Sequence, residues 1–215
     1  MMIPLLKMDF FMTANYFMII LFVVPYMYVM NISPPFTFVG LQIWLLIGLF
    51  YYDQQSGIHK FLVSLPVDRT NIVRARYLFA AIFLFLTFVY FVLIDRLAHR
   101  YLHYLEYQPI SARAAWMYIC ISLIIYALSF PIYYHFSYLA ALMVQVLLFI
   151  VLPGTFLLLL NMVVKFKIQW VIDAAEQFFS YFSAHPFLVA IPATLVSYLI
   201  SLFLSQKIFM KKDLK

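Results

Sequence analysis

Six apolar runs, each free of Asp, Glu, Lys and Arg, follow one another along the chain and are separated by shorter polar segments. The runs cover residues 12–30, 36–52, 77–94, 114–134, 137–164 and 187–206. An α-helix needs roughly 20 apolar residues to cross the hydrocarbon core of a bilayer, and each run comes close to that length or exceeds it. The pattern predicts an all-α membrane protein with six transmembrane helices in one domain that covers residues 1–215.

The composition agrees with a membrane protein and argues against other classes. Hydrophobic residues make up 67% of the chain and charged residues 10%, whereas about 25% of the residues of a soluble globular protein are charged. The formal net charge of +6 fits the basic fringe that membrane proteins keep on the cytoplasmic side, so we expect no nucleic-acid partner. Cys120 is the single cysteine, so no intramolecular disulfide can form.

The distribution of Lys and Arg predicts the orientation of the chain. With both termini inside, the cytoplasmic segments hold nine basic residues: Lys7, Lys60, Arg69, Arg74, Arg76, Lys207, Lys211, Lys212 and Lys215. The outer segments then hold five, which are Arg96, Arg100, Arg113, Lys165 and Lys167. Because basic residues gather in the loops that stay in the cytoplasm, the excess favours a topology with both termini there.

The densest polar stretch lies between the second and third apolar runs, at residues 53–76. Residues 59–65 can form about two turns of helix, which Pro66 ends because proline cannot continue the hydrogen-bond ladder. The apolar side chains around this short helix need a partner's groove or lipid headgroups to cover them; they are Phe61, Leu62, Leu65 and Val67. From periodicity alone, a helix that lies on the bilayer surface is an equally good interpretation.

A second segment outside the runs, residues 168–183, has apolar residues at spacings of three and four. They are Ile168, Val171, Ile172, Ala175, Phe178, Phe179 and Phe182. This spacing predicts an amphipathic helix at the outer surface. The pattern does not distinguish a gate that closes the outer mouth from an interfacial anchor.

Two histidines, His99 and His103, stand four residues apart, a spacing compatible with metal ligation on a helix. Arg96 and Arg100 flank them and disfavour a bound cation. We therefore expect a solvated interfacial helix here and no metal.

The motifs of several enzyme and carrier classes are missing from the sequence. The chain has four glycines and no G-x-x-x-x-G-K-[ST] loop, so it does not carry its own P-loop for ATP. It also has no H-E-x-x-H or G-x-S-x-G motif, and its apolar runs hold no charged residue. These absences argue against an intramembrane enzyme and against a proton-coupled carrier, which would need ionisable groups at membrane depth.

Four segments of the sequence resemble the ABC-2-type transporter permeases. The run KFLVSLPVDRTNIVRARYL at residues 60–78 resembles the first cytoplasmic loop of that family, with its Ser-Leu-Pro core and following Arg. LLKMDFF at residues 5–11 resembles the amphipathic N-terminal elbow, and SQKIFMKKDLK at residues 205–215 resembles the basic C-terminal tail. FPIYYHFSY at residues 130–138 is similar to the second cytoplasmic loop, although Ser137 stands where a glycine is usual.

The resemblance implies the membrane subunit of a bacterial ABC exporter with the six-helix, type V exporter-like fold, in the bacterial cytoplasmic membrane. In that family the first cytoplasmic loop is a coupling helix that docks on a separate ATPase subunit. Carried over to this chain, the ATPase-coupling residues are Phe61, Ser64, Leu65, Pro66, Val67 and Arg69. The family's short helices before the last span imply an outer gate at Ile168, Val171, Ile172, Phe178, Phe179 and Phe182. ATP and Mg²⁺ would bind the ATPase subunit, and this chain would hold neither a cofactor nor a catalytic residue.

The resemblance further implies a second permease subunit, which is identical or different, and a cargo such as an amphipathic peptide or another lipophilic compound. Two other interpretations stay open from the residues alone. One is a membrane adaptor that docks a soluble partner without transport, and the other, less favoured, is an intramembrane enzyme.

Overall fold

The computed structural model describes residues 2–56, 68–165, 169 and 186–211, and these residues form helices joined by short connections. The helices are α1 (Met2–Met12), α2 (Ala14–Val29), α3 (Pro34–Ser56), α5 (Arg69–Tyr101), α6 (Ala112–His135), α7 (Tyr138–Val146), a π-helical turn η1 (Leu147–Val151), α8 (Leu152–Lys165) and α10 (Pro186–Lys211). The described part of the chain contains no strand, as the apolar runs predicted.

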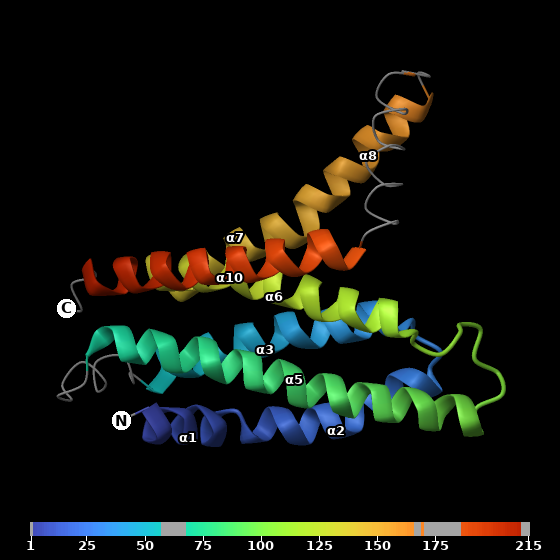
Figure 1. Ribbon diagram of the computed structural model, residues 1–215, viewed down its shortest axis with the longest axis horizontal. Coiled ribbons are helices and arrows are strands. Elements are labelled where there is room, and N and C mark those ends of the chain that lie inside the picture. The colour runs from blue at the N-terminus through green and yellow to red at the C-terminus, as the bar shows by residue number, and fades with distance from the viewer. Residues whose placement is uncertain (1, 57–67, 166–168, 170–185, 212–215) are drawn as a thin grey trace.

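The long helices lie side by side in a layered bundle (Figure 1). α5 packs against α1 and α2 on one side and α10 on the other, while α6 packs against α3 and α10. Both chain termini lie at the same end of this bundle, together with the last residues of α3 and the first residues of α5 (Figure 1). We call this the terminus end. The opposite end carries the connection from α5 to α6.

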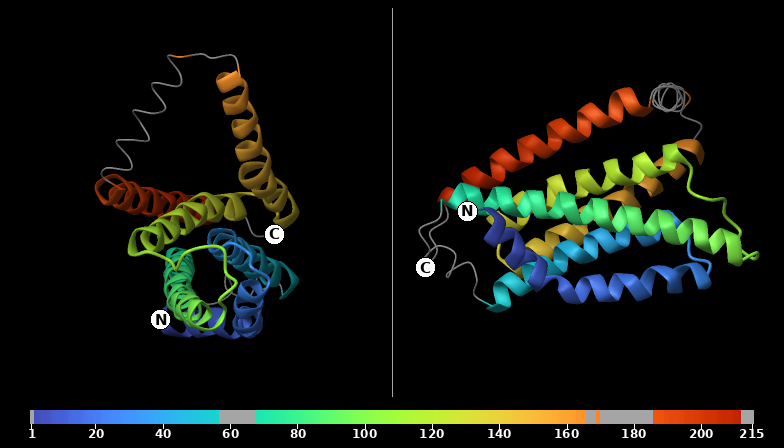
Figure 2. Two further views of the ribbon diagram at one scale, coloured as in Figure 1. Left: turned by 90° about the vertical axis from the view of Figure 1, so that its right-hand side faces the viewer. Right: turned by 60° about the horizontal axis from the view of Figure 1, so that its bottom comes forward.

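Four helices within the described residues are long and apolar enough to span a membrane, and they cover Pro34–Gln55, Arg69–Tyr101, Ala112–His135 and Ala190–Lys211. The pair α1 and α2, bent by 50° at Thr13, makes a fifth candidate if it counts as one span. The fifth apolar run, residues 137–164, folds as α7, η1 and α8 in succession, and α8 leans away from the bundle (Figure 2). Six spans therefore remain a prediction.

Two helices extend beyond the places where charged residues or proline suggest an end. The apolar run at residues 77–94 is the centre of α5, a helix of 33 residues that begins at Arg69 and ends at Tyr101. The sequence predicts that Pro131 closes the fourth span, and this prediction is wrong, because α6 continues through Pro131 to His135. A proline inside a helix removes one backbone hydrogen bond, and packing of the surrounding aromatic residues holds the helix together across it.

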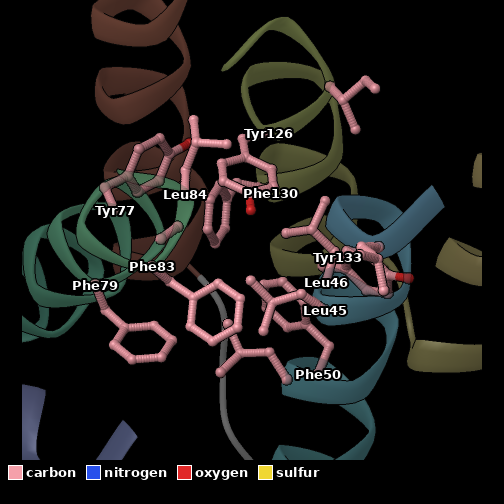
Figure 3. Packing of buried hydrophobic residues seen from close by; sticks show 14 of the residues in the cluster. Leu45, Leu46, Phe50, Tyr77, Phe79, Phe83, Leu84, Tyr126, Phe130 and Tyr133 are labelled. Atoms are coloured by element: carbon pink, nitrogen blue, oxygen red, sulfur yellow. The ribbon is translucent and has the colours of Figure 1, made fainter. Parts of the chain in front are cut away.

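Aromatic side chains fill the core between α3, α5 and α6. The ring of Tyr77 stacks on Phe130 with 4.3 Å between ring centroids, and Phe50 stacks on Tyr133 at 4.2 Å. Figure 3 shows the first pair beside the α5 helix, with Phe83 lying toward the leucines of α3. Most of these residues come from the apolar runs, so the runs supply the core as well as the surface that faces lipid.

The turn from α2 to α3 is set by its capping residues. Asn31 follows the end of α2 with a φ of 54°, a left-handed conformation that Asn tolerates better than most residues. The amide of Ile32 donates to the carbonyl of Met27, and the amide of Asn31 donates to that of Tyr28, which is the Schellman pattern. The next helix then begins at Pro34, a favoured first position for proline.

Candidate functional site

A buried cluster of three charged residues joins three helices at the terminus end. Asp9 of α1, Asp53 of α3 and Arg76 of α5 form this group, which we call the Arg76 cluster. The side chains of all three are at most 2% exposed. The cluster is therefore removed from water, although each member lies close to a polar segment in the sequence.

The guanidinium of Arg76 contacts its two carboxylate partners through different nitrogen atoms. Its two terminal nitrogens donate to the two carboxylate oxygens of Asp53, and the bond from Nη2 to Oδ1 measures 2.6 Å. Its Nε atom lies 3.1 Å from Oδ1 of Asp9. A planar fork of this kind can hold two carboxylates at once, which the single ammonium of lysine cannot reproduce.

The Arg76 cluster joins the helices on either side of the polar loop. Asp53 lies three residues before the end of α3 and Arg76 lies in the second turn of α5, so the ion pair links the end of one helix to the beginning of the next. Asp9 adds α1 to the same contact. Removing one partner of a buried pair costs about 3–5 kcal/mol, so these contacts hold α1, α3 and α5 together at this end of the bundle.

One of the six predicted coupling residues lies within the described part of the chain. Arg69 begins α5, and its Nη1 donates to the backbone carbonyl of Met210 in α10 at 3.3 Å. The first residue of α5 is thereby joined to the last helix. The other five, Phe61, Ser64, Leu65, Pro66 and Val67, lie outside the described residues, as do all six predicted gate residues, Ile168, Val171, Ile172, Phe178, Phe179 and Phe182.

Further polar contacts tie α5 to the last helix within the bundle. The hydroxyl of Tyr77 lies 2.6 Å from that of Ser201 and 2.7 Å from that of Ser205, and Tyr198 donates to the carbonyl of Tyr77 at 2.8 Å. Ser201 also donates to the carbonyl of Ala127 in α6 at 2.5 Å. These bonds connect α5, α6 and α10 directly after Arg76, because Tyr77 is the next residue along α5.

A second buried carboxylate, Asp95, organises the opposite end of the bundle. The side chain is 1% exposed, and its two oxygens accept hydrogen bonds of 2.9 Å from the hydroxyl of Tyr28 and the amide of Ile110. Tyr28 lies in the last turn of α2 and Ile110 precedes α6, so the carboxylate of α5 holds the connection at residues 102–111 against two helices. Burial, with the Asp95 charge adding to it, raises the pKa of the Tyr107 hydroxyl in this connection.

His99 completes this second cluster. Its Nδ1 lies 2.9 Å from the carbonyl oxygen of Asp95, and its Nε2 lies 2.9 Å from the carbonyl oxygen of Tyr107. Because carbonyl oxygens only accept, the imidazolium with both nitrogens protonated satisfies both contacts, and the Asp95 carboxylate lies 3.5 Å from it. The helix ends at Tyr101, so His99 and His103 do not share a helix face, and the helix expected here does not reach His103. Among the described residues, no group of three or more His, Cys, Asp or Glu side chains could hold a metal.

Sequence reasoning missed the Arg76 cluster. The apolar runs place Arg76 among the basic residues of a cytoplasmic loop and Asp53 just after the second span, and Asp9 enters only as part of the segment that resembles the N-terminal elbow. The structure buries all three within helices. The available signal was that each charge sits next to a strongly apolar stretch, where a charged side chain must be neutralised by a partner.

One of three comparisons with known proteins finds a match. A family model described as ABC-2 family transporter protein matches residues 4–210. No curated protein and no solved structure matches the chain.

Proposed function

Because this chain belongs to the ABC-2 transporter family, we propose that it is the transmembrane subunit of an ATP-driven exporter and that it couples to a separate ATPase subunit. The observation that carries the proposal is the family match over residues 4–210, which covers every described helix of the bundle. ATP and Mg²⁺ bind the ATPase subunit, since this chain has no P-loop. The chain itself contributes packing, gating and transmission of motion.

In this proposal residues 59–65, which Pro66 ends, are the coupling helix. The Arg76 cluster supports the assignment, because it joins α3 and α5, the helices before and after the loop, to each other and to α1 through an ion pair that is hidden from water. Arg69 extends the connection to α10. Closure of two ATPase subunits on ATP would shift the loop, and the buried contacts would carry the shift into the helices. ATP drives such a switch to the extent that its affinity differs between the two states.

The same proposal specifies the partner subunit, the membrane, the orientation and the cargo. The chain pairs with a second permease subunit across a translocation pathway in the bacterial cytoplasmic membrane. Both termini lie in the cytoplasm, which their shared end of the bundle and the excess of basic residues support. The cargo is an amphipathic peptide or another lipophilic compound, a class suited to the 20% aromatic content of the chain.

Replacing Leu65 with Asp tests the coupling helix and its cytoplasmic location together. A charge desolvated at the centre of an interface costs about 2–5 kcal/mol, so we expect copurification with the ATPase subunit to fall at least tenfold. The measurement is the ratio of ATPase to permease in material solubilised from the native membrane. Gln55→Asp is the matched control, because it adds the same charge at an exposed position beside the loop and should retain the ATPase. Equal retention in both variants would contradict the assignment.

The outer gate is a second part of the proposal and has its own test. If Phe179 seals the exit, Phe179→Ala removes packing worth about 3–5 kcal/mol in a buried site. ATPase activity of the purified complex should then persist or rise while export of the cargo falls. Wild-type export per ATP hydrolysed, at equal expression, would show that residues 168–183 anchor the chain at the surface and do not gate it.

A further inference from the structure

The bend between α1 and α2 carries a hollow on its surface at the terminus end. Among the described residues, Leu6, Lys7, Phe10, Phe11 and Ala14 line it, and its volume is about 460 Å³. These residues recur at spacings of three and four, so they share one face that continues across the 50° bend at Thr13. The hollow therefore belongs to one continuous surface of the bent helix pair.

The lining of the hollow is apolar with one positive charge. Phe11 is 73% exposed, and the Nζ atom of Lys7 lies 5.9 Å from the centroid of its ring. Asp9, two residues after Lys7, points into the bundle and binds Arg76, so it does not neutralise this lysine. No ion pair joins Lys7 to a carboxylate of the described residues.

The same face continues along α2 as exposed apolar side chains. Met18 is 57% exposed and Phe22 is 72% exposed, and both follow Ala14 at intervals of four residues. The helix rises by about 12 Å from Ala14 to Phe22, eight residues further along, which fits within one half of the roughly 30 Å hydrocarbon core. The surface thus has a positive charge at one end, on Lys7. Next to this charge lies an exposed apolar strip whose length is about that of one acyl chain.

We propose that this surface, from Lys7 to Phe22, binds a phospholipid with an anionic headgroup. Lys7 contacts the headgroup, one acyl chain fills the hollow between Phe10 and Ala14, and the chain continues along Met18 and Phe22. The charge complementarity decides the class of lipid, because a zwitterionic headgroup carries its own cation next to the phosphate. The site does not depend on the identity of the exported compound.

Tryptophan quenching by brominated lipid tests the proposal on the full chain. Phe11→Trp is introduced with Trp44, Trp116 and Trp170 replaced by Phe, which leaves one reporter in the hollow. The chain is reconstituted in two kinds of phosphatidylcholine bilayer that contain the same small fraction of brominated lipid. The brominated lipid is phosphatidylglycerol in one and phosphatidylcholine in the other. We expect the reporter to prefer brominated phosphatidylglycerol by about fivefold, the equivalent of about 1 kcal/mol for one lysine near the surface.

Two charge variants separate this site from a general surface effect. Lys7→Gln should reduce the preference to near unity, whereas Lys207→Gln, which removes the same charge from an exposed position on α10, should leave it unchanged. Native mass spectrometry of the otherwise unaltered chain, titrated with phosphatidylglycerol, should show the same difference between Lys7→Gln and Lys207→Gln without the reporter.

Four results would overturn the proposal. They are equal quenching by the two lipids, no quenching by either lipid because protein covers the hollow, a preference that survives Lys7→Gln, and a preference that Lys207→Gln removes equally.

Discussion

Replacing Arg76 with Gln is expected to destabilise the bundle by about 3–5 kcal/mol, because the change leaves the carboxylates of Asp9 and Asp53 buried without their guanidinium. The expected result is a large drop in the thermal stability of the purified chain, with loss of the bound ATPase at matched expression. Arg74→Gln is the control, since Arg74 lies two residues earlier on α5 and is exposed. Its effect should stay within about 0.5 kcal/mol.

A double-mutant cycle shows whether the pair with Asp53 accounts for the loss. The double variant Asp53→Asn with Arg76→Gln buries one unpaired carboxylate, whereas Arg76→Gln alone buries two. The double variant should therefore be more stable than the sum of the two single effects predicts. Arg76→Lys should fall between wild type and Arg76→Gln, because one ammonium cannot donate to both carboxylates in the arginine's geometry. If Arg76→Gln were as stable as Arg74→Gln, the cluster would not hold the three helices together.

The cores of the spans could be predicted from the sequence, and their ends could not. An uninterrupted apolar run indicates a helix reliably, and the runs at 36–52, 77–94, 114–134 and 187–206 all lie within helices of the structure. The ends were placed at the first charged residue, on the assumption that a charge marks the water. That assumption fails at Asp53, Arg76 and Asp95, because each of these charged side chains is buried within the bundle against a partner from another helix.

Partners that neutralise a buried charge come from distant parts of the chain, which is why the candidate site was only partly predictable. Arg76 and Asp53 are 23 residues apart, and Tyr28 and Asp95 are 67 residues apart. A local pattern cannot show such a pairing. The family resemblance identified the loop at residues 60–78, and the match over residues 4–210 confirms that resemblance, but neither shows how the loop is fixed to the bundle.

The fifth apolar run shows a different limit of sequence patterns. Its 28 residues read as one long span, yet the helix contains a π-helical turn at Leu147–Val151 and changes direction before α8. Gln145, just before this turn, is 3% exposed and accepts a hydrogen bond from Tyr133 of α6. A polar side chain inside an apolar run has to find a partner, and α7 stays with the bundle at this point while α8 leaves it.

Replacing Asp95 with Ala is expected to release the connection at residues 102–111 from the bundle. The change leaves the hydroxyl of Tyr28 and the amide of Ile110 without their acceptor, and each buried unpaired group costs about 1–3 kcal/mol. It also removes the carboxylate that faces His99. The sum of these losses predicts a local opening, because His99, which still contacts the carbonyl of Tyr107, no longer faces a carboxylate, and another remaining bond, from Tyr104 to the carbonyl of Val29, lies at an exposed position.

Cysteine labelling at Ile110 measures this opening, since Ile110 is partly buried and donates its amide to Asp95. In a Cys120→Ser background, Ile110→Cys should react with a water-soluble thiol reagent at least tenfold faster when Asp95 is Ala than when it is Asp. Gln108→Cys, which is exposed already, should react at the same rate in both backgrounds and serves as the control. Asp95→Asn should fall between the two, because its amide keeps one acceptor oxygen for Tyr28 or Ile110 but presents a donor to the other. Equal labelling of Ile110→Cys in all three backgrounds would mean that the connection is held at this end of the bundle by other contacts, and that Asp95 does not control it.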